Sequence, residues 1–135
     1  MADLRAELTD VVIRLDLAEA LLAGRRQLRV PLSALRMVHV EEEPMRDIAL
    51  LRFPGLCWPG SFAVGTARRG RLREFAAVRA GRPAVVLDIE GGAWDRVVVS
   101  VPNAVGTAAE LAALLLGRNP GRPGQRGRLP ITPQD

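Results

Sequence analysis

The sequence predicts a mainly β fold of the α+β class, in which strands come first and one amphipathic helix comes last. About seven short segments alternate apolar and polar residues and are separated by turns that contain glycine. A helical pattern long enough to cover a sheet follows only after the last of them, within residues 102–117. Strand runs that end in a helix favour a curved antiparallel sandwich or a partly open barrel, with the helix covering one end.

Length and composition indicate one folded domain. A chain of 135 residues buries a single core. The 48% hydrophobic and 25% charged residues are ordinary for a globular protein. We expect the domain to span residues 1–117. The remainder, residues 118–135, is rich in Pro, Gly and Arg and is expected to be a disordered tail.

The basic charge is concentrated in that tail. All 19 basic residues are arginine, and the formal net charge is +4. Residues 118–135 hold four arginines against one acid, so residues 1–117 carry a net charge of only +1. No aromatic platform accompanies the tail arginines, and we therefore do not expect nucleic acid as a partner.

No segment of the sequence is expected to cross a membrane. The longest apolar runs fall far short of the roughly 20 residues that a transmembrane helix needs. The N-terminal residues carry charges and lack the apolar stretch of a secretory signal. The sequence therefore predicts a cytoplasmic location.

The first half predicts four strands around one short helix. The strands are expected over residues 4–8, 11–15, 27–30 and 36–42. Between the second and third strands, Leu17 to Ala23 predicts a short helix with Asp16 as its N-cap and Gly24 as its end. In the fourth strand, Val38 and Val40 are expected to face the core, while Met37 and His39 face away.

The second half predicts further strands and the helix. The strands are expected over residues 61–67, 74–79, 84–90 and 96–101, with Arg68 to Arg73 as a hairpin connection. The helix is expected to begin at Asn103 or at Thr107, which opens a capping-box pattern with Glu110. Gly117 is expected to end it.

The stretch from Leu51 to Arg71 concentrates the rare residues of the chain. It holds the single Cys and one of two Trp. It also holds two places where an aromatic residue is followed directly by Pro-Gly. The run Arg52 to Thr66 resembles the Arg-x-Pro-Gly, Pro-Gly, Gly-x-x pattern of bacterial PH-like (pleckstrin-homology-like) domains. Val30 to Ser33 and Val99 to Asn103 are also similar to small PH-like proteins of GC-rich actinobacteria.

The resemblance covers residues 4–117 and implies a PH-like fold of about seven antiparallel strands with a C-terminal helix. PH-like domains of bacteria share no catalytic residues, so the resemblance transfers none to this chain. PH folds elsewhere bind anionic lipid headgroups, peptides or proteins, and the fold alone does not select among these ligands.

Catalytic and metal-binding chemistry has few candidates in the sequence. Cys57 lacks a base and an orienting group, because the single His39 lies on a separate predicted strand. Glu41 to Glu43 form a carboxylate cluster. We interpret it as a solvated strand end, because the sequence has no second acidic cluster with the spacing needed to complete a metal site. We therefore expect no catalytic residue, no metal and no cofactor, and a protein that is not an enzyme.

Binding surfaces have better candidates. Arg68, Arg69, Arg71 and Arg73 form a compact basic hairpin suited to a phosphate or a carboxylate, with a solvated turn as the alternative. Phe53 and Trp58 are candidate interface residues, with a plug at the mouth of a barrel as the alternative for Trp58. The predicted function is a binding or scaffolding module for a protein partner or a second copy. The alternative is peripheral binding of anionic lipid, or another phosphate ligand, through the arginine hairpin.

Overall fold

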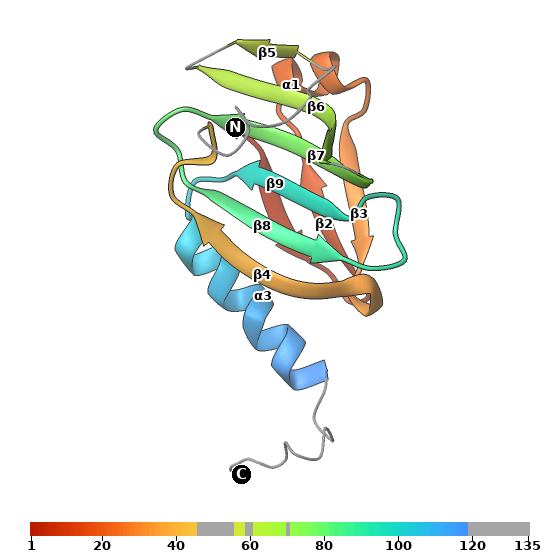
Figure 1. Ribbon diagram of the computed structural model, residues 1–135. Coiled ribbons are helices and arrows are strands. Elements are labelled where there is room, and N and C mark those ends of the chain that lie inside the picture. The colour runs from red at the N-terminus through yellow and green to blue at the C-terminus, as the bar shows by residue number, and fades with distance from the viewer. Residues whose placement is uncertain (46–55, 59–60, 70, 119–135) are drawn as a thin grey trace.

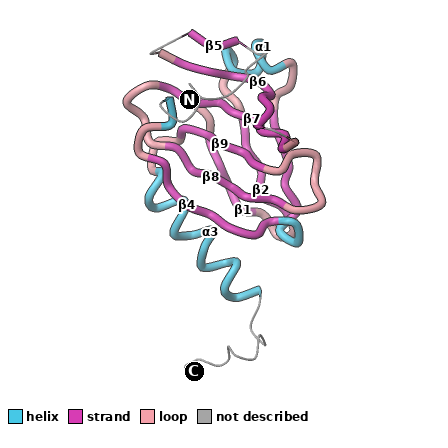
Figure 2. The backbone as a smooth tube through the Cα atoms, viewed as in Figure 1, coloured by secondary structure: helices cyan, strands magenta, loops and turns pink. Residues whose placement is uncertain are grey.

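The computed structural model describes residues 1–45, 56–58, 61–69 and 71–118, and at 56–58, 67, 69 and 118 it describes the backbone alone. Within these ranges the chain forms nine strands in two sheets, followed by a C-terminal helix (Figures 1 and 2). The predicted α+β class is confirmed. The two sheets stay separate and form no closed barrel within the described ranges.

The smaller sheet is an antiparallel meander with a helix inserted into it. Its strands are β1 (Asp3–Ala6), β2 (Asp10–Arg14) and β3 (Gln27–Pro31), in the order β1-β2-β3. Helix α1 (Leu17–Ala23) connects β2 to β3. The Asp16 side chain accepts a hydrogen bond from the Glu19 N–H and the Glu19 side chain accepts one from the Asp16 N–H, so a capping box opens the helix. Gly24 ends it at φ 74°, as predicted.

The larger sheet has six strands in the order β4-β8-β9-β7-β6-β5. They are β4 (Leu35–Glu41), β5 (Leu56–Trp58), β6 (Phe62–Arg69), β7 (Leu72–Arg79), β8 (Ala84–Ile89) and β9 (Arg96–Ser100). A 3-10 turn, η1 (Leu32–Ala34), carries the chain from β3 into β4. The predicted strand segments all occur, shifted by one or two residues. β5 was not foreseen, and the described residues form nine strands where about seven were expected.

The expectation that all neighbouring strands are antiparallel is wrong at one pair, because β7 and β9 run parallel. Strand β9 pairs with β8 as an antiparallel neighbour and inserts between β8 and β7. The short connection from β7 to β8 therefore passes the end of β9. The buried Ser100 hydroxyl fastens it there, accepting from the Arg79 N–H and donating to the Arg82 carbonyl, both at 3.0 Å. Alternating polarity predicts strands but not their order, so the sequence did not reveal this insertion.

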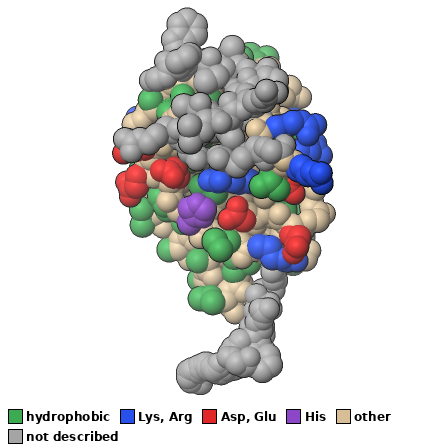
Figure 3. Space-filling model, in the orientation of Figure 1, with side chains coloured by type: hydrophobic (Ala, Val, Ile, Leu, Met, Phe, Trp, Pro, Cys, Tyr) green, Lys and Arg blue, Asp and Glu red, His purple; other side chains and the backbone are tan. Residues whose placement is uncertain are grey.

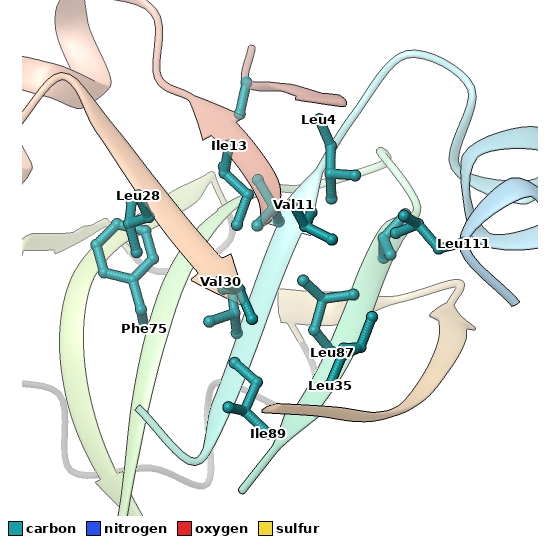
Figure 4. Packing of buried hydrophobic residues seen from close by; sticks show 14 of the residues in the cluster. Leu4, Val11, Ile13, Leu28, Val30, Leu35, Phe75, Leu87, Ile89 and Leu111 are labelled. Carbon is teal, nitrogen blue, oxygen red and sulfur yellow. The ribbon is translucent and has the colours of Figure 1, made fainter. Parts of the chain in front are cut away.

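The main core lies between the two sheets and beneath the C-terminal helix (Figure 4). Residues on β2, β3 and β8 meet there, among them Ile13, Val30 and Leu87. The run Val97 to Val99 shows why β9 is a central strand. Val97 and Val99 join the main core, whereas Val98 joins a second buried cluster formed with Ala63, Ala76, Val78, Ala84 and Val86.

The C-terminal helix α3 (Ala104–Arg118) begins at the earlier of the two predicted positions. The Asn103 side chain accepts from the Gly106 N–H at 3.2 Å, so Asn103 is the cap and Thr107 lies inside the first turns. The prediction that Gly117 ends the helix is wrong, since the helix continues through Arg118. Helix α3 packs on β4 and β8 through buried residues such as Leu111. The predicted tail from residue 119 onward lies outside the described residues.

Candidate functional site

The arginine hairpin is formed by the facing ends of β6 and β7. Arg68 lies directly opposite Arg73, and Arg69 lies opposite Leu72. Arg68 and Arg69 thus belong to β6 and Arg73 to β7, so the connection is shorter than the predicted span from Arg68 to Arg73. Directly opposed residues in an antiparallel pair have Cβ atoms roughly 5 Å apart, which places two guanidinium groups on one side of the hairpin.

The hairpin arginines whose side chains the structure describes are exposed and form no ion pair among the described residues. Arg68, Arg71 and Arg73 are all exposed, and none of them takes part in the ion pairs found there. Arg5, Arg29, Arg36 and Arg79, by contrast, do form such pairs. The side chain of Arg69, the fourth predicted member of the hairpin, lies outside the described residues. Three guanidinium groups that form no ion pair with a described carboxylate are thus accessible to an anion from solution.

The tertiary fold adds a further arginine, Arg25, which the sequence pattern does not single out. The guanidinium of Arg25 lies 4.9 Å from the ring centroid of Trp94. Trp94 in turn meets Phe75 edge to face at 5.7 Å, and Phe75 lies two residues after Arg73 on the same side of β7. No local signal in the sequence links Arg25 to the hairpin, since the contact runs through the single side chain of Trp94.

Asp95 fixes the backbone of this region. The N–H of Arg73 donates to the Asp95 carboxylate at 2.8 Å, and the N–H of Asp95 donates to the Arg73 carbonyl at 2.8 Å. The loop between β8 and β9 is therefore tied to the hairpin. Figure 3 shows a group of basic side chains at the right-hand edge of the molecule, where β6 turns into β7. We call Arg25, Arg68, Arg71 and Arg73 the arginine surface.

The arginine surface suits oxyanions. A guanidinium group presents several donors in a planar fork that matches two oxygens of a phosphate or a carboxylate, and it remains charged at every physiological pH. A group of such forks on a backbone held by Asp95 binds an anion without first having to release a described carboxylate. This arrangement can recognise negative charge.

Two exposed leucines on helix α1 precede Arg25. Leu17 and Leu21 on α1 are 79% and 75% exposed and stand one helical turn apart on the same side. The helix leads through Gly24 directly into Arg25. Helix α1 thus exposes apolar side chains shortly before the exposed cation of Arg25 along the chain.

The first turn of α1 carries a charge cluster whose acids and arginine already pair with each other. The Arg79 Nη2 lies 2.8 Å from the Asp16 carboxylate and 3.7 Å from that of Glu19, which is only 1% exposed. Burial acts to raise the pKa of Asp16, but the hydrogen bond from the N-terminal ammonium, the Glu19 N–H and the charge of Arg79 outweigh it and hold that pKa below its usual value. This cluster anchors α1 to β7.

Some of the remaining candidate residues have side chains outside the described part of the chain, and the structure places the others. The side chains of Phe53, Cys57 and Trp58 lie outside the described residues. His39 is exposed on β4, and Val38 and Val40 pack on the core, as predicted. A Glu41 carboxylate oxygen accepts from the Glu43 N–H at 3.0 Å. Within the described ranges, no three His, Cys, Asp or Glu residues come together as metal ligands would.

Comparisons with known proteins found no matching protein-family model, no matching curated protein and no matching solved structure. In the part of the chain that the structure describes, no helix has the length and apolar character needed to span a membrane.

Proposed function

We propose that this protein is a non-catalytic binding module and that its arginine surface docks on an anionic membrane surface. The observation that carries the proposal is the exposure of Arg68, Arg71 and Arg73 without an ion-pair partner among the described residues. Basic residues near a bilayer that contains anionic lipid contribute about 1 kcal/mol each to binding. Several arginines on one surface are therefore enough for reversible attachment.

The leucines of α1 favour a membrane over a free phosphate ion as the ligand. A small anion would gain nothing from Leu17 and Leu21, whereas a bilayer accepts apolar side chains at the boundary between headgroups and acyl chains. Arg25 follows these leucines along the chain. Charge would thus bring the module to the surface, and the leucines would add a contribution that salt does not screen.

The resemblance to bacterial PH-like domains is part of this proposal. The order of strands followed by a C-terminal helix supports it, whereas the parallel pairing of β7 with β9 departs from the all-antiparallel sheets that the resemblance implies. Phe53 and Trp58, the candidate interface residues, add no support because their side chains lie outside the described residues.

Co-sedimentation with liposomes tests the proposal. We expect the protein to pellet with vesicles of phosphatidylcholine and phosphatidylglycerol and to stay in the supernatant with phosphatidylcholine alone. The triple variant R68Q/R71Q/R73Q should lose most of this binding. Raising the salt concentration should weaken the binding of the unchanged protein, because the surface charges are then screened.

A matched control separates a specific surface from net charge. The triple variant R5Q/R29Q/R82Q removes the same number of charges from other parts of the surface and should keep most of the binding. Equal losses in the two triples would overturn the arginine surface as the site. Equal pelleting with both vesicle types would overturn the anionic membrane as the ligand, and titration with inorganic phosphate would then test the simpler anion.

A further inference from the structure

Strand β4 is an open edge of the larger sheet. The strand order places it at one end, with β8 as its only neighbour among the described strands. β4 has seven residues, whereas β5 at the opposite end has three. The ladder with β8 is regular from Met37 to Glu41, and the single irregularity falls between Leu35 and Met37. An edge of this length presents a row of backbone donors and acceptors that a further strand can use.

The charges along this edge complement themselves in an antiparallel arrangement. Arg36 stands near the start of β4, and Glu41 to Glu43 stand at its end. When two copies of β4 run antiparallel, the basic start of each strand meets the acidic end of the other. A pairing centred on His39 brings Arg36, in the irregular step before the regular ladder, level with Glu42 of the second copy, which directly follows the last residue of β4. This contact occurs twice by symmetry. Opposite charges across a strand pair stabilise that pair.

An apolar groove continues this surface beside the start of β4. It has a volume of about 570 Å³ and lies between α3 and η1, lined by residues that include Leu32, Ala113, Leu114 and Gly117. Leu8 lines its rim and is 97% exposed. Figure 1 shows that α3 passes beneath β4 and continues beyond it. On that last part of the helix Leu116 is 77% exposed.

We propose that two copies of this chain associate through β4, paired antiparallel, with the groove beside α3 covered in the same interface. A stable interface buries about 1,200–2,000 Å² in total, which is more than one short strand pair supplies. Leu8 and the exposed leucines of α3 supply the additional apolar area. The two copies form a closed dimer, because a two-fold axis at His39 uses the β4 edge of both copies.

The inference is independent of the membrane proposal, since β4 and the arginine surface share no residue. Arg36 forms an ion pair with Glu90 at 2.9 Å and donates to the Ser33 carbonyl within its own chain. Both side chains of that ion pair are largely exposed, so Arg36 can redirect toward a second copy. The variant E90Q removes the internal pair alone and provides the control.

Charge reversal tests the dimer. Size-exclusion chromatography with light scattering should give twice the mass of one chain for the unchanged protein and for E90Q. The variant R36E sets two carboxylates against each other across the interface, and E42R/E43R sets two guanidinium groups against each other, so each variant alone should be a monomer. For each, the dissociation constant should rise roughly tenfold or more, because two symmetric pairs change from attraction to repulsion.

Mixing the two variants should restore the dimer. In the mixed dimer, the glutamate introduced by R36E faces the arginine introduced by E42R/E43R in the other copy. The second contact pairs the unchanged Arg36 of one copy with the unchanged Glu42 of the other, so both contacts are again attractive. Recovery also shows that neither variant is merely unfolded. An unchanged protein that is monomeric at about millimolar concentration, an R36E variant that stays dimeric, or variants that remain monomers after mixing would each overturn the proposal.

Discussion

Two arginines at opposite ends of β7 have opposite surroundings. Arg79 at the end of the strand reaches Asp16 and the buried Glu19 and thereby holds α1 against the sheet. Arg73 at the start of the strand is exposed, lies opposite Arg68, and has no ion pair among the described residues. The same residue type therefore stabilises the fold at one end and remains accessible for binding at the other. The difference arises from the residues that the fold brings to each end.

The largest expected effect is that of Arg79→Met. This substitution keeps much of the apolar stem but leaves the carboxylate of Glu19 buried without its cation. Breaking a buried pair in this way costs about 3–5 kcal/mol, and we expect about 2–3 kcal/mol here because the Arg79 side chain is itself 40% exposed and partly screened by solvent. Urea denaturation measures the loss.

A double variant provides the control for that loss. E19Q/R79M removes the uncompensated charge and should recover part of the stability of R79M. An ordinary surface substitution changes the free energy of unfolding by about 0.5 kcal/mol or less. If the value for R79M differed from that of the unchanged protein by no more than this, Arg79 would contribute no more to stability than an exposed arginine.

The next effect concerns the helix cap. Asp16→Ala removes both the acceptor for the Glu19 N–H and the closest carboxylate of Arg79, and it should destabilise the protein by about 1–2 kcal/mol. Asp16→Asn keeps the cap and removes only the charge, so thermal unfolding should give an intermediate midpoint. Equal midpoints for the two variants would show that the cap itself adds nothing.

Low pH should weaken the ion pair of Asp16 with Arg79, whereas the arginines at the other end of β7 stay charged. The pKa of Asp16 is lowered in the folded chain, so its contribution to stability is complete above the pKa of about 3.9 in the unfolded chain. That contribution is lost as the pH falls through the lower folded value. Below about pH 4 the stability difference between the unchanged protein and D16N should therefore shrink. A difference that stays constant down to about pH 2 would contradict this assignment.

The sequence predicted local structure better than long-range contacts, and the two ends of β7 show why. The cap at Asp16 and the end at Gly24 depend on residues within one helical turn, and both are confirmed. The pairing of Arg79 with α1 spans 63 positions along the chain, and the position of Arg25 depends on Trp94. The insertion of β9 depends on a buried hydroxyl and a short connection. Patterns of alternating polarity carry no information about such contacts.

The smallest effect should come from Arg68 and should be a gain in stability. Arg68 and Arg73 are like charges placed directly opposite each other, which disfavours the strand pair. Arg68→Glu changes repulsion into attraction and should raise the Tm by roughly 1–3 °C. The same variant should bind anionic vesicles less well.

A double-mutant cycle shows whether that gain belongs to the pair. R68E/R73E restores two like charges, so its Tm should return close to that of the unchanged protein, whereas its binding to anionic vesicles should be lower still. A stability gain that persists in the double variant would trace to something other than the opposed arginines. If R68E binds vesicles less well but is more stable, the like-charged pair lowers the stability of the fold and raises its affinity for the ligand. This trade between stability and binding is expected of residues that serve binding.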